Sequence, residues 1–328
     1  MKDLLLLLCH YPFEEKNREP LTKLLQEVQD WNKTVSLIND HGIIALAAYN
    51  IKEAGLAKEI PIDAMTVLEN GYMLSVVRNA WLTERWKEVD TILSGAGIRH
   101  ILLKGMALEH TLYGSKGLRQ MTDNDIYINP DESLKAWKLL QQHGFKMRPL
   151  KSSLFRKIIF ELGQHLPALF KDDYAVEIHD NLFDIEDYKE FNNINPFDSC
   201  VEINLSGHKA LIPEKDIHLS YLMEHFEKHK LNGECQLRMY ADIKLLDSKS
   251  KVEFSDSYIS EPKQGYKTEF RKAAYKTTLR SIPSKHRLWF ILGDMFPSVK
   301  WMMVRYKCNM GRAILYYPKR IGKLWWLV

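Results

Sequence analysis

The feature that most constrains the fold of this chain is a succession of strand, glycine turn, helix and strand signals in residues 98–128. Residues 98–103 form a mainly apolar run that predicts a strand. Gly105 permits a sharp backbone turn directly after this run. Residues 106–113 are compatible with a helix, because two of their leucines are one helical turn apart. We therefore expect a strand that leads through a tight turn into a helix, followed by a second strand.

Two aspartates stand at the beginning of the second strand. Asp123 and Asp125 adjoin the apolar run 126–128, although aspartate is a poor strand former. Because side chains alternate along a strand, both point the same way, with Cα atoms roughly 6–7 Å apart. At about 6 Å, two carboxylates repel by roughly 3 kcal/mol at an effective dielectric constant of 20. A divalent cation would reverse this cost, and without one Asp125→Asn should slightly stabilise the protein.

The residues at the turn are suited to a phosphate. A helix that begins beside Gly105 presents free backbone N–H groups, and Lys104 adds a positive charge. An isolated pair of aspartates also occurs in ordinary polar turns. A phosphate site followed by a carboxylate pair instead indicates metal-assisted phosphoryl chemistry.

A further carboxylate lies in residues 175–179, which follow a predicted hairpin turn at residues 172–173. Strand alternation places two aliphatic side chains on one face, so that Glu177 and His179 share the other. Glu177 belongs either to a solvated face or to a site, and the aspartate pair favours the site. His179 has three open roles: it orients the carboxylate, contacts the substrate or is a structural histidine.

Several spaced motifs resemble the bacterial family of uncharacterised nucleotidyltransferases within the polymerase-beta-like superfamily. They are Leu-Lys-Gly at 103–105, Leu-Arg-Gln-Met at 118–121, Asp-Asn-Asp-Ile at 123–126, Val-Glu-Ile-His at 176–179, H-x-x-x-H at 225–229 and R-x-x-x-D at 238–242. The resemblance spans roughly residues 98–246. It implies an α+β fold in which a polymerase-beta-like nucleotidyltransferase core, a mixed sheet with flanking helices, lies between N-terminal and C-terminal helical lobes.

The resemblance also implies roles for individual residues. The glycine turn that holds the triphosphate falls on Gly105, and the metal ligands for Mg²⁺ (or Mn²⁺) fall on Asp123, Asp125 and Glu177. Glu177 has the alternative role of deprotonating the acceptor. The superfamily usually has Gly-Gly or Gly-Ser at the phosphate turn, whereas this chain shares Lys-Gly with the family, so nucleotide placement can differ from better-known relatives.

Other polar residues are assigned around these ligands. Lys104 and Arg119 would balance the phosphate charge. Residues with an expected supporting role in the cleft are His179, His225, His229, Arg238 and Asp242. The two helical histidines carry only a weak zinc signal, because Glu227 is in the wrong place for a metalloprotease motif.

We therefore expect an enzyme, a metal-dependent nucleotidyltransferase that binds a nucleoside triphosphate such as ATP. The acceptor stays open between a small molecule, a sugar and a protein side chain. The alternative from another class is a non-catalytic nucleotide- or partner-binding protein on the same fold. Acyl-transfer and redox functions have no support, because the sequence contains no G-x-S-x-G motif, Walker loop or dinucleotide-binding glycine fingerprint.

The chain is expected to have three parts: a helical lobe (1–95), the nucleotidyltransferase core (96–212) and a second helical lobe with a basic aromatic tail (213–328). In the first lobe, apolar spacing predicts helices in residues 21–28, 43–54 and 72–93. The four cysteines are scattered and form no C-x-x-C pair, which indicates reduced thiols and a cytoplasmic location. No stretch approaches the roughly 20 apolar residues that cross a bilayer.

Charge is concentrated at the C-terminal end of the chain. Residues 251–328 contain 16 Lys and Arg against five Asp and Glu, so that residues 1–250 carry −7 of the total charge of +4. Tryptophan and tyrosine side chains are interleaved with these basic residues. Three readings stay open: a structural helical cap, an anionic membrane surface that would make the protein peripheral to the inner face of the membrane, and the less favoured nucleic acid.

Overall fold

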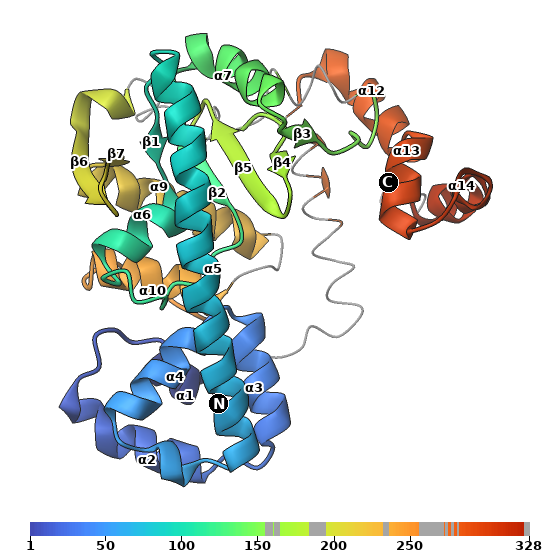
Figure 1. Cartoon of the computed structure of the whole chain (residues 1–328). Helices are drawn as coiled ribbons and strands as arrows, with labels where there is room; N and C mark the ends of the chain where they lie inside the picture. Colours follow the sequence, from blue (N-terminus) through green and yellow to red (C-terminus); the bar gives the residue numbers. More distant parts are fainter. Residues whose placement is uncertain are drawn as a thin grey trace. The chain divides into compact units, whose positions relative to one another are not determined.

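The structure is a computed structural model that describes residues 1–154, 160, 165–183, 195–231, 236–255, 272, 275–276, 279–280 and 282–324. These residues form an α+β fold with twelve α-helices and a seven-stranded mixed sheet (Figure 1), which confirms the predicted fold class. The strand order is β3-β4-β5-β2-β1-β7-β6. The chain divides into two compact units, Met1–Ile126 with Ile194–Pro262 and Tyr127–Asn193 with Lys263–Val328. The three-part division expected from the sequence stays a prediction.

The first unit begins with a group of short helices that surround a hydrophobic core. They are α1 (Lys2–Leu8), η1 (Glu15–Asn17), α2 (Arg18–Gln26), α3 (Trp31–Asp40), α4 (Ile44–Glu53) and η2 (Ala57–Glu59). The long helix α5 (Ile62–Gly95) follows, and Figure 1 shows it leading from these helices toward β1. Helices are therefore present in all three predicted segments. The third begins ten residues earlier than expected, directly after Pro61, because residues 62–71 also carry buried apolar side chains at helical spacing.

The rest of the first unit contains both strands and helices. The elements are β1 (Ile101–Leu102), α6 (Lys104–Thr111), β2 (Asn124–Tyr127), η3 (Pro196–Ser199), β6 (Cys200–Leu205), β7 (His208–Pro213), α9 (Lys215–Leu231) and α10 (Leu237–Leu246). Strand β1 pairs with β7 in parallel, and β6 and β7 form an antiparallel hairpin. All four residues of β2 are buried, which matches its apolar sequence apart from the two polar residues at its start.

The second unit contains a hairpin, the helix before it and three C-terminal helices. Its elements are α7 (Pro130–Gln142), β3 (Lys146–Met147), β4 (Leu169–Lys171), β5 (Tyr174–His179), α12 (Ser284–Met295), α13 (Val299–Tyr306) and α14 (Met310–Leu324). The predicted turn at residues 172–173 joins β4 to β5, and Asp172 has a left-handed φ of 52° there. None of the helices in the described ranges is long and apolar enough to cross a membrane.

Candidate active site

The turn after β1 is the first part of the site, and its geometry corrects one expectation. The residue with a positive φ, 45°, is Lys104 and not Gly105, so the lysine itself makes the sharp turn into α6. Gly105 is needed for another reason: a Cβ atom at this position would lie 3.0 Å from Cγ of Met121. A left-handed lysine is sterically disfavoured and persists only where its surroundings fix it. The backbone N–H of Leu103 donates a hydrogen bond to the carbonyl of Asp125, which ties the turn to β2.

The side chain of Lys104 points to the predicted metal ligands. Its Nζ lies 2.8 Å from Oδ1 of Asp125, and both side chains are largely buried, with 13% and 7% of their surface exposed. The ammonium group also lies 5.6 Å from the ring centre of Tyr221 on α9. The charge of Asp125 is therefore compensated by Lys104. The expected stabilisation by Asp125→Asn does not fit this geometry, because that substitution would leave a buried ammonium group without its carboxylate.

The second aspartate has a different environment. Asp123 precedes β2, is half-buried and accepts a hydrogen bond from the hydroxyl of Thr122. Burial raises the pKa of Asp123, and the negative charge of Asp125 raises it further, while Lys104 and Arg238 act in the opposite direction. The repulsion expected between the two carboxylates therefore contributes to the raised pKa of Asp123. A bound cation would lower this cost.

The hairpin of the second unit carries the other predicted ligand. In β5, Val176 and Ile178 are buried, and Nε2 of His179 lies 3.9 Å from Oε2 of Glu177. The alternation expected for this strand is therefore present. The imidazole of His179 is buried, and its ring centre lies 5.3 Å from that of His165.

Three of these side chains form a group of potential metal ligands. One ligand atom from each of Asp125, Glu177 and His179 lies within 4.8 Å of the others, so that the group could hold a metal ion. Asp123 was expected in this group and is not among its members. His179 was not predicted as a ligand; the signal that could have found it is its spacing from Glu177, which puts both on one face of a strand.

Arg119, assigned to phosphate binding, is engaged in a buried ion pair. Its Nε lies 2.9 and 2.8 Å from the two carboxylate oxygens of Asp242 on α10. The hydroxyl of Tyr113 donates a third hydrogen bond to the same carboxylate. Burial raises the pKa of Asp242, although Arg119 and Tyr113 both lower it. These contacts hold α10 against the loop after α6, and the phosphate role of Arg119 stays a prediction.

A buried carboxylate that we did not expect from the sequence also holds this loop in place. Glu109 accepts hydrogen bonds from the backbone N–H groups of Gly117 and Arg119 at 2.5 and 2.8 Å. Burial raises the pKa of Glu109, whereas these hydrogen bonds lower it. Gly117 has a φ of 74°, and a Cβ there would lie 2.7 Å from Cα of Val76. Because its hydrogen-bond donors are backbone N–H groups, Glu109 belongs to no motif that the sequence could reveal.

Arg238 is the third cation beside the carboxylates. Its Nη1 donates to the carbonyl of Gln120 at 3.1 Å, and its Nε has no hydrogen-bond partner among the described residues. Burial and the charge of Arg119 lower the pKa of Arg238 to about 10, while Asp242, Asp123 and Asp125 act against this shift. The guanidinium group thus lies within the field of the two aspartates.

The remaining predicted residues lie on α9. His225 and His229 are in edge-to-face contact, with ring centres 4.5 Å apart, and the ring of Tyr221 lies 6.2 Å from that of His225. Neither histidine belongs to a group of metal ligands in the part of the chain that was described. Their supporting role stays a prediction, and the helix connects them to Tyr221, which lies beside Lys104.

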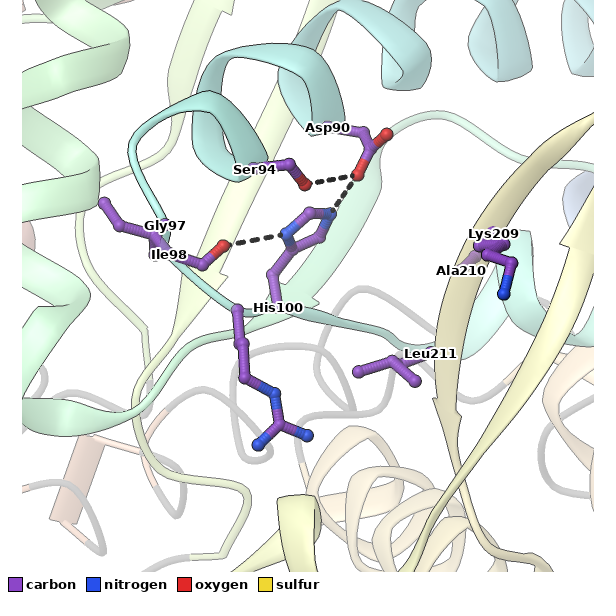
Figure 2. A pocket seen from close by; sticks show the side chains of 9 residues that line it. Asp90, Ser94, Gly97, Ile98, His100, Lys209, Ala210 and Leu211 are labelled. Atoms are coloured by element: carbon purple, nitrogen blue, oxygen red, sulfur yellow. Dashed lines mark hydrogen bonds and ion pairs between the residues drawn. The ribbon is translucent and has the colours of Figure 1, made fainter.

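A cavity of about 270 Å³ lies at the other end of β1, before this strand rather than after it. In Figure 2 the ring of His100 lies between Asp90 and the backbone of Ile98. Oδ1 of Asp90 accepts a hydrogen bond from Ser94 at 3.0 Å and lies 3.4 Å from Nε2 of His100. Burial lowers the pKa of His100, although Asp90 raises it. None of the predicted site residues lines this cavity.

Comparison with known proteins identifies the family. A family described as "Uncharacterised nucleotidyltransferase" matches residues 27–279, which include the β1–α6–β2 segment, the β4–β5 hairpin and α10. No curated protein and no solved structure matches the chain. The matched region is more than half of the 328 residues, and this chain therefore belongs to the uncharacterised nucleotidyltransferase family and is a transferase.

Proposed function

We propose that the protein transfers a nucleoside monophosphate from a nucleoside triphosphate to an acceptor hydroxyl, with Mg²⁺ or Mn²⁺ bound by Asp123, Asp125 and Glu177. The observation that carries this proposal is the group of Asp125, Glu177 and His179, which could hold a metal ion. Lys104 adjoins this group at a strained turn directly after β1. Strained backbones and buried charged side chains are enriched at functional sites, although structural ion pairs also contain buried charges.

The residues present fit a divalent cation. Asp123, Asp125 and Glu177 offer carboxylate oxygens, which are the ligands that Mg²⁺ and Mn²⁺ prefer. The grouping of His179 with two of these carboxylates supports a metal site and favours Mn²⁺, since imidazole is a rare ligand for Mg²⁺. A bound cation would supply charge neutralisation at the phosphates.

The cations of the chain have separate tasks in this proposal. A cation bound by Asp125 would neutralise its charge, and the ammonium group of Lys104 would then be available to a phosphate oxygen. Arg238, whose Nε has no partner among the described residues, would bind a second phosphate oxygen. Arg119 would support the loop through Asp242. Arg238 thus replaces Arg119 as our preferred phosphate ligand.

The transfer itself is a displacement at the α-phosphorus. The acceptor oxygen forms a bond to this phosphorus, the bond to the bridging oxygen breaks, and pyrophosphate leaves. The proton of the acceptor hydroxyl moves to a carboxylate. Glu177, whose side chain is 25% exposed, is the candidate in its alternative role, in which it accepts this proton and does not bind the cation. Positioning and charge stabilisation carry such a reaction, and no covalent intermediate with the protein is required.

The test is a transfer assay with α-labelled nucleoside triphosphates and a panel of small-molecule, sugar and protein acceptors, with Mg²⁺ or Mn²⁺. The wild-type protein should release pyrophosphate and label one class of acceptor, and a chelator should abolish both. Asp63→Asn, at an exposed position in the first turn of α5, is the matched control for substitutions of Asp123 and Asp125.

One observation favours the non-catalytic alternative: Lys104 already provides the counter-charge that a metal ion would bring to Asp125. A nucleotide-binding protein on this fold would keep that ion pair when it binds its ligand. Calorimetric titration of the protein with a non-hydrolysable triphosphate distinguishes the two proposals. Tight binding that is independent of divalent cations, without transfer to any acceptor, would favour the binding protein.

A further inference from the structure

We propose that the outer surface of helices α12–α14 binds an anionic phospholipid membrane surface, independently of the proposed transfer reaction. Residues 284–324 contain nine Lys and Arg and one acidic residue. That residue, Asp294, is buried and forms an ion pair with Lys151. The three helices therefore expose basic side chains and no acidic one.

The helices are held in place by contacts within their own unit. The hydroxyl of Ser298, which caps α13, donates a hydrogen bond to the carbonyl of Leu150 at 2.9 Å. The rings of Tyr306 and Tyr316 stack with centres 4.2 Å apart, which joins α13 to α14. One face of α14 is thus fixed, and Ala313 on this face is completely buried.

Other apolar side chains of α14 are exposed. Met310, Ile314 and Leu315 expose 60%, 52% and 76% of their surface. Leu288 and Trp289 on α12 expose 61% and 49%. Soluble surfaces normally scatter such side chains singly, whereas these five lie on two helices that contact each other.

The combination of exposed aliphatic and basic side chains identifies the partner. Arg312 lies on α14 between Met310 and Ile314 in sequence, and it is exposed. An amphipathic helix of this kind lies in the membrane interface, with its aliphatic side chains in the acyl region and its basic side chains at anionic headgroups. Nucleic acid would be bound by basic and stacked aromatic groups and would gain little from exposed aliphatic side chains. The charge and the aliphatic surface together fit an anionic lipid surface.

The test uses the full-length protein and sedimentation with vesicles of phosphatidylcholine, with or without phosphatidylserine. The protein should be retained by the anionic vesicles at low salt and released as the Debye length falls from about 30 Å at 0.01 M to about 8 Å at 0.15 M. Two double variants test the two kinds of side chain. The first replaces the aliphatic pair (Ile314→Gln with Leu315→Gln), and the second reverses two basic charges (Lys300→Glu with Arg312→Glu). Each should weaken retention at least tenfold. Glu is favourable in the first helical turn, so the charge reversals should leave α13 and α14 folded.

A matched control comes from the first unit, where Met73 and Leu74 expose 58% and 70% of their surface on α5. Met73→Gln with Leu74→Gln should leave vesicle binding unchanged. Three results would overturn the proposal. They are no retention of the wild-type protein on anionic vesicles at low salt, a loss of retention in the α5 control equal to that in the α14 variant, or unchanged retention of the α14 variant. A single-stranded oligonucleotide could instead displace the protein from the vesicles and bind the α14 variant as tightly as it binds the wild-type protein. That result would identify nucleic acid as the partner.

Discussion

The β1–α6–β2 segment and the C-terminal helices both contain many charged side chains, but the charges differ in burial and in sign. At Lys104 and Asp125 the charges are buried, opposite in sign and fixed by a strained backbone. On α12–α14 they are exposed and of one sign, apart from the buried Asp294. Burial makes each charge sensitive to a single neighbour, whereas exposure to solvent leaves only the summed field. We therefore expect single substitutions to act strongly in the first region and weakly in the second.

The largest effect is expected from Asp125→Asn on transfer. The substitution preserves shape but removes a charge that would bind the metal ion in the proposed function. The rate should therefore fall about a thousandfold or more, which corresponds to roughly 4 kcal/mol of transition-state stabilisation. Pyrophosphate release by the purified variant checks this, with thermal melts to verify folding. Near-native activity in a folded Asp125→Asn protein would exclude the two-carboxylate mechanism.

A large effect on stability is expected from Asp242→Asn. The carboxylate holds Arg119 in a buried ion pair, and breaking such a pair costs roughly 3–5 kcal/mol because the remaining charge is buried without compensation. Urea denaturation should show this loss. The exposed pair of Lys23 and Glu19 is the control, because Glu19→Gln should leave the free energy of unfolding nearly unchanged. Equal effects would contradict the contrast between buried and exposed charges.

The two aspartates should differ in their effect on stability. The native pKa of Asp123 is raised, so the native state is favoured at low pH and loses stability as pH rises from about 3.9 through that native pKa. Asp123→Asn should remove this loss and raise the melting temperature at neutral pH, whereas Asp125→Asn should lower it by removing the carboxylate that pairs with Lys104. Melting curves from pH 3 to pH 8 measure both. If the melting temperatures of the two variants changed with pH in the same way, the ion pair with Lys104 would not make the two aspartates different.

A smaller effect on stability is expected from two substitutions of Lys104, which separate the contribution of backbone strain from that of charge. Lys104→Gly and Lys104→Ala both remove the ammonium group, but only glycine adopts the φ of 45° without steric cost. The glycine variant should be more stable by about 1 kcal/mol, and both should lose transfer activity. Chemical denaturation of the pair provides the measurement. A more stable alanine variant would show that this turn relaxes.

The smallest effect is expected in the C-terminal helices. Ile314→Gln with Leu315→Gln replaces exposed side chains, so the free energy of unfolding should change by no more than about 0.5 kcal/mol. Transfer to a water-soluble acceptor should also be unchanged. Denaturation and transfer assays on this variant complete the comparison. A large loss of stability would mean that these side chains are packed in solution.

The sequence by itself determined the fold class, the family and the principal elements. Local signals were sufficient for these: apolar periodicity for the helices, and polar turn residues for the β4–β5 hairpin. The alternation that puts Glu177 and His179 on one face of β5 was also readable, because a strand has a fixed period of two residues.

The tertiary structure decided the partners of each charge. Lys104 pairs with Asp125, 21 residues away, and Arg119 pairs with Asp242, 123 residues away. No local pattern encodes these distances, because the chain folds back through loops whose path depends on packing. The left-handed conformation of Lys104 could not be predicted from the sequence for a related reason. The neighbouring Gly105 adopts a positive φ more readily, so local propensity assigns the turn to the glycine. Local sequence thus specifies which groups are available, and only the folded chain determines which of them meet.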